Sequence, residues 1–126
     1  MKKFILISLV LFTFLSCSKE EGYGGLSSIS GKIRGKNVNS NGVTINEDFI
    51  GDIKVYISKH NDPNYFDSKD SAYDGSFKFD FLQPGSYDVW VFGDCDSCAW
   101  AQVYKLQTVD IAKKEDKNIG NIVITF

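Results

Sequence analysis

Apolar residues recur at every second position in several short stretches of this chain, and this period of two most constrains its fold. In "GDIKVYISK", Ile53, Val55 and Ile57 fall on one side of an extended strand, with polar residues between them. The same alternation runs through "SFKFDF", "SYDVWVF" and the C-terminal "NIVITF". No window of helical length has a clear apolar face. We therefore expect an all-β domain.

Turn residues separate these stretches. Asp74-Gly75 predicts a hairpin, because glycine accepts a positive φ and aspartate tolerates a turn. Gln83-Pro84-Gly85 predicts a second tight turn. Seven or eight short strands at this spacing are typical of a β-sandwich. The residues expected in its core are Ile53, Val55, Phe77, Phe79, Tyr87, Val89, Ile122 and Ile124.

One longer motif resembles a known family. "DGSFKF" followed by "FLQPGSYDVWV" is similar to the signature of transthyretin-like, carboxypeptidase regulatory-like domains. In that signature an Asp-Gly turn leads a Phe-rich strand, and a Leu-x-Pro-Gly turn leads a strand that opens with tyrosine. The matching residues are Asp74, Gly75, Phe77, Phe79, Leu82, Pro84, Gly85, Tyr87 and Val89. The resemblance implies a single transthyretin-like sandwich of seven to eight strands over residues 29–126.

The N-terminus has the pattern of an export signal. Lys2 and Lys3 precede an apolar run that ends before Cys17, and this run is too short for a bilayer, which needs about 20 apolar residues. Residues 1–16 are therefore predicted to be a signal peptide. The sequence "FLSC" resembles a bacterial lipobox, which implies acyl chains, such as palmitate, on Cys17 and a membrane anchor.

Residues 17–28 form a Gly- and Ser-rich stretch that we expect to be a flexible tether. Within it, Lys19, Glu20 and Glu21 resemble the surface-export signal of Bacteroidetes lipoproteins. This resemblance implies a protein of the outer membrane that faces the cell exterior. The alternative is a merely solvating acidic tether on a protein that faces the periplasm.

Cys95 and Cys98 are two residues apart in "GDCDSCAW". An exported chain meets oxidising conditions, so we expect a short structural disulfide at the tip of a hairpin. Free thiols, a redox pair and part of a metal site remain as alternatives. The redox reading needs a helix start that this sequence does not predict, and zinc needs four ligands.

Trp90, Trp100 and Tyr104 are candidate ligand-binding residues. If "SYDVWVF" and "AWAQVYKL" pair as a hairpin, these rings could form an exposed platform, and flat aromatic faces beside polar groups suit sugar rings. The alternative is that they pack under loops or in the core.

The sequence offers no catalytic constellation. His60 is the only histidine and lies in a polar loop, where we expect it to be solvated. No cofactor and no metal site are predicted. With 14 basic and 16 acidic residues and no basic stripe, nucleic acid is not an expected partner.

We therefore expect a non-enzymatic binding or structural lipoprotein. A carbohydrate-binding accessory protein and an adhesion or assembly subunit, with a glycan or protein partner, are the alternatives.

Overall fold

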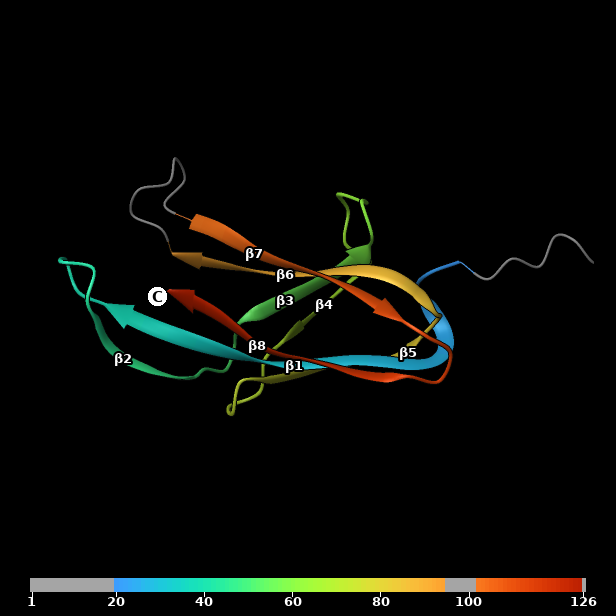
Figure 1. Ribbon diagram of the computed structural model, residues 1–126, viewed down its shortest axis with the longest axis horizontal. Helices are drawn as coiled ribbons and strands as arrows, with labels where there is room; N and C mark the ends of the chain where they lie inside the picture. Colours follow the sequence, from blue (N-terminus) through green and yellow to red (C-terminus); the bar gives the residue numbers. More distant parts are fainter. Residues whose placement is uncertain (1–19, 95–101, 126) are drawn as a thin grey trace, which may run out of the picture.

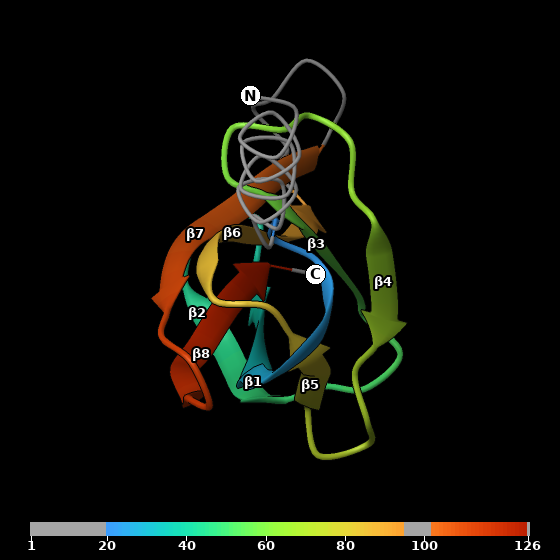
Figure 2. The same cartoon turned by 90° about the vertical axis from the view of Figure 1, so that its right-hand side faces the viewer.

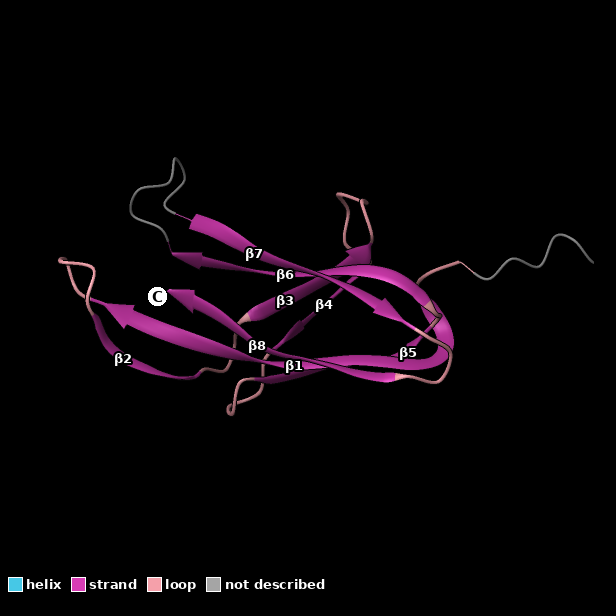
Figure 3. Ribbon diagram, viewed as in Figure 1, coloured by secondary structure: helices cyan, strands magenta, loops and turns pink. Residues whose placement is uncertain are grey.

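The computed structural model describes residues 20–94 and 102–125, and these residues form strands joined by loops. Figure 3 shows no helix in these two ranges, and so none that could cross a membrane. The eight strands (Figure 1) are β1 (Tyr23–Val38), β2 (Thr44–Phe49), β3 (Lys54–Lys59), β4 (Asp67–Asp70), β5 (Ser76–Leu82), β6 (Gly85–Asp94), β7 (Gln102–Ile111) and β8 (Asp116–Thr125). The expected all-β class and strand number are confirmed.

The strands form two four-stranded sheets. In the first sheet, the long β1 pairs antiparallel with β2 and β5 and parallel with β8. The second sheet has the order β4-β3-β6-β7, and all its pairings are antiparallel. Viewed along the strands, the second sheet curves over the first (Figure 2). The result is a β-sandwich.

The core lies between the two sheets and is filled by the alternating residues. Its buried members are Ile29, Ile33, Val55, Ile57, Phe77, Phe79, Leu82, Tyr87, Val89, Val91, Val109, Ile111, Ile122 and Ile124. Seven of the eight predicted core residues are among them, and Ile53 packs against the cluster while partly exposed. Burial of apolar surface at about 25 cal/mol per Å² makes this layer the main source of stability.

The alternation of β5 breaks at its end. Phe77 and Phe79 are buried as expected, but Phe81 has a φ of 60° and is 68% exposed. Ile29 is opposite Phe79, whereas Ser27 is opposite Leu82, so the pairing with β1 shifts between them. This β-bulge turns Phe81 outward and places Leu82 in the core instead.

The Asp74-Gly75 turn is present, but it does not join a hairpin within one sheet. The amide of Gly75 donates to the carbonyl of Ala72, and Asp74 accepts bonds from the amide and hydroxyl of Ser76. However, β4 lies in the second sheet and β5 in the first. The hairpin expectation is corrected: the local chemistry makes the turn, and the partners of each strand decide that the turn crosses between sheets.

Half of the predicted tether belongs to the folded domain. Residues 23–28, which we expected to belong to the tether, are part of β1. The Tyr87 hydroxyl donates to the carbonyl of Gln83, 2.6 Å away, and accepts a bond from the amide of Gly22 at 2.8 Å. A tyrosine hydroxyl bonded to backbone a few residues upstream also closes corners in other sandwiches. Here it holds the start of β1 against β6.

Candidate functional site

Aromatic side chains gather on the outer face of the second sheet, the face turned away from the core. Tyr56 in β3 is opposite Trp90 in β6, and Trp90 is opposite Leu106 in β7. In the next row, Phe92 is opposite Tyr104. Residues directly opposite each other on paired strands share a face of the sheet, and Phe92 is two positions from Trp90 in β6. All five side chains are therefore on one face. Strand pairing therefore brings together side chains from three strands.

The rings contact one another. Tyr56 and Trp90 are stacked, with centroids 5.7 Å apart and planes 14° from parallel. Phe92 meets Tyr56 edge-on at 5.8 Å. Tyr65, from the β3–β4 loop, contacts Tyr56 at 4.8 Å and Trp90 at 6.4 Å, both edge-on. Such geometries are the preferred ones for aromatic pairs. The cluster is thus preformed rather than a set of separate side chains.

These rings line a groove of about 440 Å³, which we call the aromatic groove. Its full lining is Tyr56, Ser58, Asp62, Pro63, Tyr65, Asp88, Trp90, Phe92, Tyr104 and Leu106. Trp90 is half-buried beside the loop, whereas Tyr65 and Tyr104 are 54% and 59% exposed. Exposed rings gathered along one groove make it a candidate binding site.

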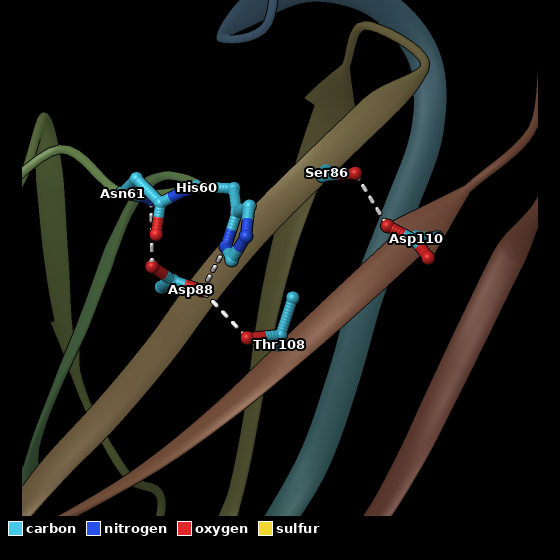
Figure 4. A network of polar contacts seen from close by, with 6 residues as sticks. All are labelled: His60, Asn61, Ser86, Asp88, Thr108 and Asp110. Atoms are coloured by element: carbon cyan, nitrogen blue, oxygen red, sulfur yellow. Dashed lines mark hydrogen bonds and ion pairs between the residues drawn. The ribbon is translucent and has the colours of Figure 1, made fainter.

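One end of the aromatic groove is polar and centres on Asp88 (Figure 4). The Asp88 side chain is nearly buried, and its Oδ1 accepts bonds from Nδ1 of His60 and Oγ1 of Thr108, both at 2.9 Å. Its Oδ2 accepts the amide of Asn61 at 3.1 Å. In the same view Ser86 donates to Asp110. Asp88 thereby ties β6, β7 and the start of the β3–β4 loop together.

The electrostatics of the aromatic groove are acidic. Burial by itself would raise the pKa of Asp88, but the hydrogen bonds from His60, Thr108 and Asn61 outweigh it and hold that pKa below its ordinary value. Asp88 is therefore ionised at neutral pH and accepts only, so Nδ1 of His60 carries the proton between them. The charged residues of the lining, Asp62 and Asp88, are both acidic.

A larger groove of about 530 Å³ differs in character. Its lining includes Lys32, Lys69 and Lys78, and its one ring, Phe77, belongs to the core. The cations of Lys32 and Lys69 lie over the rings of Phe49 and Phe79. Of the two grooves, only the aromatic groove offers a cluster of exposed rings.

The structure describes part of the predicted set of site residues. It brings Trp90 and Tyr104 to one face of the β6–β7 pair, which forms as expected. Trp100, Cys95 and Cys98 lie outside the described residues, as do Cys17 and Lys19. Glu20 is 3.6 Å from Lys59, and Glu21 lies against Gly85.

Sequence reasoning missed much of the aromatic groove. Tyr56 and Phe92 could have been found, because each occupies the outward position of a clean alternation. Tyr65 comes from a loop and gave no signal. His60 is 43% exposed, as a loop residue would be, but its contact with Asp88 was not foreseen. That contact depends on the pairing of β3 with β6, which the alternation does not specify.

Comparisons with known proteins support the fold. No family model and no curated protein matches this chain. Among solved structures, a Pseudomonas aeruginosa protein described as a candidate carbohydrate-binding protein has 12% identity and a TM-score of 0.50, with 83% of this chain and 91% of that chain covered. The 5-hydroxyisourate hydrolase of Klebsiella pneumoniae has 13% identity and a TM-score of 0.43, with 86% and 94% covered. The chain has a transthyretin-like sandwich fold.

The second of these neighbours corrects one expectation. We expected a non-enzymatic protein, partly because of the fold, but one neighbour is a hydrolase. The prediction that the chain is not an enzyme is therefore withdrawn. Similarity at this level shows a fold, and a fold hosts several activities, so the comparison assigns no reaction to this chain.

Proposed function

We propose that this chain binds carbohydrate in the aromatic groove and that it does so as a lipid-anchored protein of the outer membrane. The observation that carries the binding proposal is the cluster of Tyr56, Trp90 and Tyr65, which contact one another beside the exposed Tyr104. Flat rings next to polar groups match sugars, which have apolar C–H faces and hydroxyl edges. The Pseudomonas neighbour supports the proposal weakly, through its description alone.

The charges of the aromatic groove favour neutral sugars over acidic ones. Asp62 and Asp88 supply negative charge, and no lysine or arginine is among the lining residues. A uronate or sulfate group would meet like charges in a partly desolvated site, which is unfavourable. The ligand class we propose is therefore a neutral oligosaccharide.

Titration calorimetry of the purified full-length protein tests this proposal. The ligands are neutral hexasaccharides of glucose, xylose and mannose, with a galacturonate oligomer as the acidic comparison. We expect a neutral member to bind and the acidic oligomer not to bind. Trp90→Ala and Tyr104→Ala should weaken binding roughly thirtyfold, because truncating an aromatic anchor costs about 2 kcal/mol or more. Trp100→Ala tests whether the third predicted ring also contributes to binding.

Tyr73→Ala is the matched control. Tyr73 is 93% exposed and is not part of the aromatic groove, so the substitution removes an aromatic side chain without changing the site. Its affinity should equal that of the wild type, and circular dichroism should show that all variants keep the fold. The carbohydrate proposal fails if no neutral sugar binds, or if Tyr73→Ala weakens binding as much as Trp90→Ala.

A further inference from the structure

Ser58 is an anomaly at the polar end of the aromatic groove. Its side chain is fully buried, and its hydroxyl is the one buried side-chain polar atom without a hydrogen-bond partner in the described part of the chain. Buried polar groups are nearly always paired, and an unpaired one costs about 1–3 kcal/mol. Alanine would fill the position without that cost, so the fold alone does not account for a serine here.

The position of Ser58 relates this hydroxyl to the aromatic groove. Tyr56 and Ser58 are two residues apart in β3, so both side chains are on the outer face, and Ser58 is part of the groove lining. Ser58 and Asp88 are directly opposite on paired strands, which places their Cβ atoms about 5 Å apart. The hydroxyl therefore lies beside the only strand-borne carboxylate of the lining.

Asp88 has spare hydrogen-bonding capacity on this side. A carboxylate offers about four lone-pair sites. Oδ1 of Asp88 accepts two bonds, from His60 and Thr108, whereas Oδ2 accepts one, from the amide of Asn61. One acceptor site on Oδ2 and the whole hydroxyl of Ser58 thus remain for a partner that brings both a donor and an acceptor. A sugar hydroxyl is such a group. Because the Ser58 side chain is fully buried, such a partner reaches it when the side chains that cover it move aside.

We propose that Ser58 and Asp88 form a hydroxyl-binding subsite at the end of the aromatic groove, where one hydroxyl of the bound neutral sugar donates to Asp88 and pairs with Ser58. The inference rests on the proposed function and deepens it. The rings bind the apolar face of the sugar, and this subsite sets which hydroxyl configuration is accepted. Such a site rejects an analogue without the hydroxyl, because its own polar groups would then be left unpaired.

The test is Ser58→Ala, because the proposal predicts opposite signs for two properties. Without ligand, the variant should unfold at a higher temperature than wild type, since it loses an unpaired buried hydroxyl. Its affinity for the tightest-binding neutral hexasaccharide of the calorimetry panel should fall about tenfold, the equivalent of one hydrogen bond. Ser68→Ala is the control, because Ser68 also lies in the second sheet but is not part of the groove lining.

Monodeoxy derivatives of the same sugar make the test specific. One deoxy position should weaken binding to wild type about a hundredfold, because the bonds to Asp88 and Ser58 are both lost. The same deoxy sugar should weaken binding to Ser58→Ala only about tenfold, because that variant has only the bond to Asp88 left to lose. If Ser58→Ala binds every sugar as wild type does while Trp90→Ala loses binding, the subsite is wrong and the proposed function stands. If no neutral sugar binds wild type, both proposals fail. A variant that is less stable than wild type would show that the hydroxyl is already paired within the protein, which also overturns the subsite.

Discussion

Asp88 is a nearly buried carboxylate at the polar end of the aromatic groove. Three donors from one strand and one loop converge on it, namely Thr108 in β7 and His60 and Asn61 in the β3–β4 loop. Because these bonds favour the ionised form more than burial disfavours it, the folded protein holds the pKa of Asp88 below that of an unfolded aspartate. The carboxylate consequently links folding to pH.

The sign of this linkage follows from the direction of the shift. A carboxyl group with a lowered pKa in the folded state stabilises fully above its unfolded pKa, about 3.9, and this contribution disappears as the pH falls through the folded pKa. We expect Asp88→Asn to lower the free energy of unfolding at pH 7, where the charge-assisted bonds are lost. The difference between variant and wild type should shrink as the pH falls below about 4.

Urea unfolding at pH 7, 4 and 3 measures this difference. Asp74→Asn is measured in the same way for comparison, because the hydrogen bonds from Ser76 also lower the pKa of the Asp74 carboxyl. A gap between Asp88→Asn and wild type that is as large at pH 3 as at pH 7 would contradict the role given to the charge.

At the scale of elements, the Asp74-Gly75 turn shows how one residue joins the two sheets. Gly75 has a φ of +83°, and a Cβ there would be 2.5 Å from the carbonyl oxygen of Ile33 in β1. The carbonyl of Gly75 in turn accepts the amide of Ile33 at 2.8 Å. The turn therefore needs glycine for two reasons, its positive φ and its close approach to β1.

Gly42 is a useful comparison, because it has the positive φ without the close approach. It has nearly the same φ, +79°, but a Cβ there would have no neighbour within 4 Å. Gly42→Ala should cost about 1 kcal/mol of stability for the left-handed backbone alone. Gly75→Ala should cost at least about 3 kcal/mol, because β1 must also move away. Urea unfolding of both variants measures the two losses, and equal losses would contradict the close packing of the turn on β1.

At the scale of the whole molecule, the short N-terminal segment limits how far the sandwich can lie from the membrane if Cys17 is lipidated. β1 begins at Tyr23, so five residues lie between Cys17 and the start of the sandwich, and the chain from Cys17 to Tyr23 can span at most about 20 Å. Within this segment Glu20 contacts Lys59, and Glu21 lies against Gly85. Two of the proposed export residues, Glu20 and Glu21, are thus next to the folded domain rather than separated from it by a long tether.

Surface display on intact cells tests the proposed export signal and lipid anchor. We expect antibody access to the protein on intact cells, and we expect the variant Lys19→Ala/Glu20→Ala/Glu21→Ala to stay in the outer membrane but lose that access. Cys17→Ala should lose both the membrane fraction and incorporation of labelled palmitate, because the anchor itself is gone.

Lys59→Ala is the matched control for the charge pattern. It removes the contact with Glu20, an exposed ion pair worth at most about 1 kcal/mol, without changing the three residues themselves. It should be displayed as wild type is. If the triple variant is displayed equally well, the export proposal is wrong while the lipid anchor can still be correct. If Lys59→Ala is also hidden, the ion pair rather than the signal is responsible.

Much of the fold could be predicted from the sequence because the direction of a side chain in a strand depends on the local backbone. The inward positions of Val55, Phe79 and Tyr87, and the turn at Gly75, follow from residues close together in the chain. For the same reason Trp90 could be assigned to the face opposite Val89. The sequence by itself determined these features.

Only the tertiary structure decided which of these strands pair and which faces stay open. The bulge that turns Phe81 outward depends on its register with β1, and the stacking of Trp90 on Tyr56 depends on the pairing of β6 with β3. The aromatic groove and its unpaired Ser58 arise where three strands and a loop meet. Contacts between residues far apart in the chain are selected by the packing of the whole domain, which no local pattern specifies.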